Sequence, residues 1–131
     1  MAGVRLSLSR RTVAFVTGLA RVGAGTGLVA RPEGVLRAFG VDSATAQRTA
    51  WTVRMMGARD LAIGVATVYA ATRRADVRPW LAVGAVADLA DAATNADSLR
   101  AGRVSTPVAA GTAVLGAASA ALQLRALLTK D

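Results

Sequence analysis

Five charged side chains lie near the centres of long apolar stretches of this sequence, where ionisable residues are uncommon. They are Arg21, Arg59, Asp60, Asp88 and Asp91. In apolar surroundings such groups either pair with one another or handle a proton, an ion or a polar headgroup. Two interpretations are therefore open. One is a structural network of ion pairs, and the other is a working site in which Asp88 or Asp91 carries a proton.

The available chemistry is narrow because the chain has no Cys and no His. These absences exclude disulfides, Cys/His zinc sites and His-ligated haem. They also remove the commonest general base near neutral pH. We expect no metal and no cofactor, and the residues support no catalytic assignment. The sequence favours an accessory or structural protein over an enzyme.

Helical spacing places most of these charges beside small residues. Offsets of four, three and four put Gly84, Asp88, Asp91 and Asn95 on one helix face. Small residues let helix backbones approach in lipid, and polar residues bond across helices. Similar faces combine Gly18, Arg21 and Gly25, then Gly57, Asp60 and Gly64, then Gly116, Ser119 and Gln123.

We expect Asp88 or Asp91 to lie within ion-pair reach of Arg21 or Arg59, because these residues sit at similar depth in antiparallel helices. The predicted buried polar site consists of Arg21, Arg59, Asp60, Asp88, Asp91 and Asn95.

Four apolar stretches carry these residues, each about 20 residues long and so able to span about 30 Å of hydrocarbon as a helix. They cover 12–30, 50–71, 79–99 and 106–128. The polar connection 31–49 begins with a predicted short interfacial helix that ends at Gly40. No pattern of period two persists. The sequence predicts an all-α fold, a single four-helix transmembrane bundle over 1–131 with antiparallel up-down topology.

The net charge is +8, and its distribution predicts the orientation in a membrane. Segments 1–11, 72–78 and 125–131 hold eight Lys and Arg residues, against five in 31–49 and 100–105. By the positive-inside rule, we expect a multi-pass protein of the cell membrane with both termini cytoplasmic. The basic residues form no stripe with interleaved aromatics, so we expect no nucleic-acid partner. The expected partners are membrane lipids, with a homo-oligomer or a larger membrane complex left open and any small-molecule ligand unknown.

Two segments resemble a known kind of protein: RMMGARDLAIG over 54–64 and ADLAD over 87–91, with Phe39-Gly40-Val41 between the first two long helices. They are similar to an uncharacterised family of small bacterial four-helix integral membrane proteins, alike in layout to DoxX-like proteins. The resemblance spans roughly residues 12–125. It implies a four-helix membrane fold and carries over no catalytic residue.

Two alternatives remain beside this interpretation. DoxX-like proteins have been linked to quinone-related electron transfer, so one alternative is a membrane enzyme or carrier for a lipid-soluble or quinone-like molecule, with Asp88 or Asp91 as proton carrier. The other is a soluble helical bundle in which the Asp-rich third helix faces water.

Overall fold

The computed structural model describes residues 9–103 and 106–129, which contain five helices and no strand. The all-α prediction is confirmed. Each predicted apolar stretch lies within one of the four long helices. The helices are α1 (Arg10–Ala30), α2 (Pro32–Ala38), α3 (Ser43–Thr72), α4 (Arg78–Arg100) and α5 (Thr106–Leu128).

The start of α3 corrects the prediction, which placed it near residue 50. Asp42 caps the helix: its side chain accepts a hydrogen bond from the backbone N–H of Thr45 at 3.0 Å. Hydrogen bonds from the Thr45 side chain and backbone hold the pKa of Asp42 below its ordinary value. The prediction ended the helix where apolar residues end. An exposed helical turn needs only a cap and helix-compatible residues, so α3 continues back to Ser43.

The short helix predicted at 32–39 is α2, and it ends as expected at Gly40. Gly40 has φ +84°, a conformation that residues with a side chain rarely adopt. Its N–H donates to the carbonyl of Arg37, and the N–H of Val41 donates to the carbonyl of Leu36. This turn closes the C-terminus of α2 and sends the chain back into α3.

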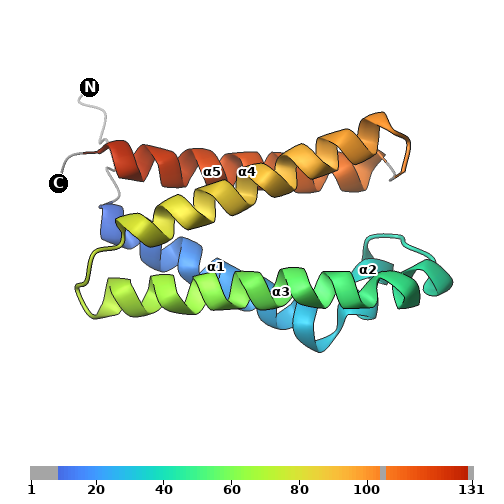
Figure 1. The fold of residues 1–131 in the computed structure, drawn as a ribbon, viewed down its shortest axis with the longest axis horizontal. Coiled ribbons are helices and arrows are strands. Elements are labelled where there is room, and N and C mark those ends of the chain that lie inside the picture. The colour runs from blue at the N-terminus through green and yellow to red at the C-terminus, as the bar shows by residue number, and fades with distance from the viewer. Residues whose placement is uncertain (1–8, 104–105, 130–131) are drawn as a thin grey trace, which may run out of the picture.

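The four long helices form two antiparallel pairs, α1 with α3 and α4 with α5 (Figure 1). We call the end that holds the start of α1, the α3–α4 turn and the end of α5 the terminal end. The opposite end, where α2 lies, is the α2 end. The two pairs are close at the terminal end and diverge toward the α2 end (Figure 1). Contacts within each pair are far more extensive than contacts between the pairs.

Glycines bring the backbones of α1 and α3 into direct contact. A Cβ atom added at Gly25 would lie 2.6 Å from the backbone N of Leu61 and 2.7 Å from the carbonyl O of Gly57. One at Gly64 would lie 2.8 Å from the carbonyl O of Gly18. No side chain fits at such distances. The predicted small-residue faces of these two helices therefore pack against each other.

The apolar core lies at the terminal end and joins both pairs. It is built mainly of alanine and valine, and Leu81 and Gln123 are the largest fully buried side chains. Its members are Val13, Ala14, Ala70, Ala71, Val77, Leu81 and Ala126. Such small residues make a thin core, so contacts other than apolar packing must hold the pairs together farther along.

Two neighbouring arginines tie the start of α1 to the ends of two other helices. The Arg10 Nε donates to the carbonyl of Ala126 at 2.9 Å, and its Nη2 donates to the carbonyl of Thr129. The Arg11 Nη1 donates to the carbonyls of Ala70 and Ala71 at 3.3 and 3.0 Å. Helix C-termini leave such carbonyls without intrahelical partners. Arg10 and Arg11 thus satisfy the last turns of α5 and α3.

Two helices of the described chain are long and apolar enough to cross a membrane. They are Arg10–Ala30 and the segment Gly111–Leu128 of α5, with mean hydropathies of 1.5 and 1.3. α3 and α4 do not meet that criterion. Charged residues in their central turns, Arg59 and Asp60 in α3 and Asp88 and Asp91 in α4, lower their hydropathy.

Candidate functional site

The charged residues singled out by the sequence meet between the two helix pairs. We call Arg21, Arg59, Asp60, Asp88 and Asp91 the Arg/Asp cluster. Arg21 comes from α1, Arg59 and Asp60 from α3, and the two remaining carboxylates from α4. Along α1 and α4 the cluster lies beyond the apolar core toward the α2 end, since Arg21 follows Val13 and Ala14 on α1 and Asp88 follows Leu81 on α4. It provides polar contacts between the pairs beyond the apolar core, in addition to those of Arg10 at the terminal end.

Arg21 is at the centre of the cluster. Its Nη1 lies 3.0 Å from Asp60 Oδ1, and its Nη2 lies 2.7 Å from Asp88 Oδ1. Nη2 also donates to the carbonyl O of Gly84 at 2.7 Å. The side chain is only 9 % exposed. One guanidinium thus joins three helices through charge-assisted hydrogen bonds.

Glycine provides the space that Arg21 needs. Gly64 packs against the Arg21 Cβ, which would lie 2.9 Å from an added Cβ. A Cβ at Gly84 would lie 3.3 Å from Arg21 Nη2 and would overlap the side-chain oxygen of Gln123. The small residues at 64 and 84 are therefore part of the site, because bulkier residues would push the guanidinium out of place.

Arg59 forms the outer half of the cluster. Its Nη2 and Nη1 bind the two carboxylate oxygens of Asp91 at 2.6 and 3.1 Å, a bidentate pair. Nη2 also lies 3.2 Å from Asp60 Oδ1, the same oxygen that Arg21 contacts. The Arg59 and Asp91 side chains are 36 % and 29 % exposed. Asp91 thus pairs with Arg59, and Asp88 pairs with Arg21.

Gln123 of α5 completes the network, and the sequence analysis did not include it in the site. Its Nε2 donates to Asp88 Oδ2 at 2.7 Å and to the Ser119 hydroxyl at 3.1 Å. The residue is 1 % exposed. The signal was present, since Gln123 and Ser119 were placed on one small and polar helix face. The result is a continuous chain of polar contacts across all four long helices: Asp91, Arg59, Asp60, Arg21, Asp88 and Gln123.

Replacing Gln123 by leucine should destabilise the protein by about 1–3 kcal/mol, because Asp88 Oδ2 then loses its partner in a buried position. The measurement is thermal unfolding of the purified protein in detergent. Gln47→Leu is the matched control, because Gln47 is exposed on α3 and its side chain bonds to no described residue. Equal melting temperatures for the two variants would show that the Gln123–Asp88 bond contributes nothing.

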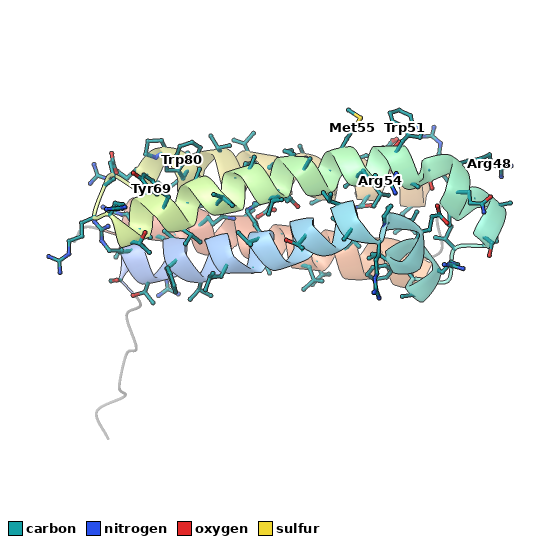
Figure 2. All side chains as sticks on the ribbon, turned by 90° about the horizontal axis from the view of Figure 1, so that it is seen from below. Arg48, Trp51, Arg54, Met55, Tyr69 and Trp80 are labelled. Atoms are coloured by element: carbon teal, nitrogen blue, oxygen red, sulfur yellow. The ribbon has the colours of Figure 1, made fainter. Side chains whose placement is uncertain are left out.

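Asn95 and Arg54 are not brought into the cluster. Asn95 lies one turn beyond Asp91 on α4 and is partly exposed, and its side chain bonds to no described residue. It shares the predicted helix face, but the pairs have already separated at that level. Arg54 is exposed near the α2 end, close to Trp51 (Figure 2). Compared with the predicted site, the observed network therefore lacks Asn95 and includes Gln123.

The cluster has the features of a structural contact in which the charged and polar groups satisfy one another. Each carboxylate has an arginine partner, and no buried side-chain N or O atom in the described residues lacks a hydrogen bond. No three of the described acidic residues converge in a way that could hold a metal ion. Three carboxylates face two guanidiniums, so the cluster carries a formal excess of one negative charge.

These features define a class: an all-α protein whose two helix pairs meet across a network of buried ion pairs. The chain belongs to the family described as a domain of unknown function, DUF4267, which matches residues 18–123. The matched range runs from Gly18 to Gln123 and so includes the whole polar network. The prediction of an uncharacterised family is confirmed, while the comparisons give no link to DoxX-like proteins. Neither the curated proteins nor the solved structures contain a match to the chain.

Proposed function

We propose that the chain is a multi-pass membrane protein in which the Arg/Asp cluster joins the two helix pairs inside the bilayer, as a structural or accessory component and not as an enzyme. The observation that carries this proposal is that large apolar side chains lie on the outside of all four long helices, while the most buried charges of the cluster lie between them. A soluble protein of this size hides its large apolar side chains and exposes its charges. Lipid as the solvent reverses that preference.

All four long helices expose large apolar side chains. Exposed examples are Phe15 and Leu19 on α1, Val65 on α3, Val86 on α4 and Leu115 on α5. Monomeric soluble proteins rarely expose contiguous apolar surface on this scale. By contrast, the inner half of the charged cluster, Arg21 with Asp60 and Asp88, is largely enclosed between the helices. This contrast weighs against a soluble bundle with the Asp-bearing helix in water.

The aromatic residues mark two levels about one membrane thickness apart. Trp51 lies toward the α2 end of α3, and Tyr69 lies near the terminal end, where Trp80 of α4 is also found (Figure 2). The numbers 51 and 69 differ by 18. At 1.5 Å per residue this spacing is about 27 Å, close to the hydrocarbon thickness of about 30 Å. Trp and Tyr favour the membrane interfaces.

On this scale the Arg/Asp cluster is at mid-depth, since Asp60 is midway between Trp51 and Tyr69 in the sequence. Charges there must find partners within the protein. The contacts of Arg21, Arg59 and Gln123 satisfy this requirement and leave no buried acceptor open. The pairing of every carboxylate of the cluster with an arginine supports the structural role. The similarity to DoxX-like proteins stays a prediction.

Cysteine labelling in intact bacterial cells tests both the number of spans and the orientation. The natural chain has no Cys, so a single Cys introduced at Ala44, Ala75 or Ala101 reports on one loop. Four spans with cytoplasmic termini predict that a membrane-impermeant maleimide labels Ala44→Cys and Ala101→Cys in intact cells. Ala75→Cys should be labelled only after lysis. The unmodified chain is the blank.

Each other pattern has a definite meaning. If only α1 and α5 span the membrane, Ala75→Cys will be labelled in intact cells together with the other two. A soluble cytoplasmic protein will be labelled at none of the three positions before lysis. Labelling of Ala75→Cys alone would show four spans with the opposite orientation, both termini outside. Either of the first two patterns overturns the four-span proposal.

A further inference from the structure

An apolar groove follows the outer face of α3 from Ala58 to Tyr69. Its volume is about 530 Å³, within the range of sites that hold small ligands. Its walls are almost wholly apolar and include Val29 of α1 and Ala58, Ala62, Ala66 and Tyr69 of α3. Ala58, Ala62 and Ala66, one helical turn apart, leave this space open beside the larger side chains of Leu61 and Val65.

At its terminal end, the groove leads to positively charged side chains. Tyr69 lines its terminal end, and the Arg73 guanidinium lies 5.6 Å from the centre of the Tyr69 ring. Arg74 follows in the turn, and the side chains of both arginines form no ion pair with a described residue. The one carboxylate in this turn, Asp76, accepts a hydrogen bond from the backbone N–H of Arg78. The turn as a whole therefore stays basic.

The groove also has the length of one leaflet. Ala58 and Tyr69 are 11 positions apart in the sequence. In a helix this is about 16 Å, close to half of the hydrocarbon thickness of about 30 Å. With Trp51 and Tyr69 at the two membrane interfaces, the groove runs from the middle of the bilayer to the interface at the terminal end.

We infer that this groove binds one acyl chain of an anionic phospholipid, whose phosphate contacts Arg73 and Arg74. The inference rests on the proposed function, since it requires the terminal end to lie at a membrane surface. The cytoplasmic leaflet, to which that orientation assigns this end, is the leaflet rich in anionic lipid. A second copy fits less well, because a twofold axis along the membrane normal would bring the Arg73 and Arg74 side chains of both copies together.

Native mass spectrometry of the full chain in detergent tests the inference, with dioleoyl phosphatidylglycerol and dioleoyl phosphatidylcholine as probes. A basic residue near an anionic lipid surface contributes about fivefold in affinity. We expect the wild type to prefer phosphatidylglycerol, and Arg73→Gln to reduce that binding about fivefold. Arg37→Gln, an exposed arginine at the opposite end, is the matched control and should change it little.

Filling the groove gives an independent measurement. Ala62→Phe should lower the binding of both lipids, whereas Ala90→Phe, on the exposed face of α4, should not. Equal binding of the two lipids to the wild type would overturn the inference, as would equal losses in Arg73→Gln and Arg37→Gln. A dimer that Ala62→Phe dissociates would assign the groove to a second copy. The cysteine-labelling experiment distinguishes failure of the groove proposal from failure of the four-span proposal. A four-span labelling pattern together with no preference between the two lipids would overturn only the groove proposal.

Discussion

Replacing Arg21 by methionine should remove most of the folded protein. The change leaves Asp88 without an arginine partner and leaves Asp60 and Asp91 to share Arg59, so one arginine remains in the cluster for three carboxylates. Breaking a buried ion pair by removing one partner costs about 3–5 kcal/mol, a large fraction of the stability of a small domain. The measurement is the yield of monodisperse protein after detergent extraction, together with its melting temperature. Arg59→Leu should follow in the same direction with a smaller effect, because that side chain is more exposed.

A matched control and a rescue make this prediction specific. Asp97 and Arg103 form an exposed ion pair at 3.5 Å, so Asp97→Asn should cost less than about 1 kcal/mol. Combining Arg21→Met with Asp60→Asn and Asp88→Asn leaves only the balanced Arg59–Asp91 pair, and should restore much of the yield. If Arg21→Met were as stable as Asp97→Asn, the cluster would not be holding the helix pairs together.

Valine in place of Gly25 should separate α1 from α3. Its Cβ would lie 2.6 and 2.7 Å from backbone atoms of Leu61 and Gly57, and backbone cannot move aside as a side chain can. Overpacking of this kind costs about 1–3 kcal/mol, and here the upper end applies because two further methyl groups must also fit. The displacement would lengthen the Arg21–Asp60 contact as well. Thermal unfolding in detergent measures the loss.

The same helix provides the control for this second prediction. A Cβ added at Gly23 or Gly27 meets nothing within 4 Å. Gly23→Ala and Gly27→Ala should therefore leave stability unchanged or raise it by up to about 1 kcal/mol, through helix propensity alone. A melting temperature for Gly25→Val equal to that of Gly23→Ala would contradict the close crossing of α1 and α3.

Much of this architecture could be predicted from local patterns. Apolar length located the four long helices, and spacing of three and four located the faces that meet, including the glycines of α1 and α3. Shared depth in antiparallel helices was enough to expect Asp88 or Asp91 near Arg21 or Arg59, but not to assign which carboxylate pairs with which arginine. Each of these inferences depends on residues within one helix, or on simple alternation of direction.

The remaining details depend on how the helices are rotated and how far they diverge, which no single segment encodes. Asn95 shares a face with Asp91 but lies where the pairs have separated. Gln123 reaches Asp88 because Gly84 leaves room beside it, a relation between α4 and α5 that sequence spacing cannot express. The early start of α3 was missed for another reason, since its first turns are polar and exposed and are set by the Asp42 cap.

The division into two helix pairs has a consequence for how the chain assembles. α1 and α3 are synthesised before α4 and α5, and Arg21, Asp60 and Arg59 already contact one another within the first pair. Gln123 likewise contacts Asp88 within the second. Each hairpin thus brings partners for part of its own charge. What is left over is positive on the earlier hairpin and negative on the later one, so the two halves attract each other and dock in a single register.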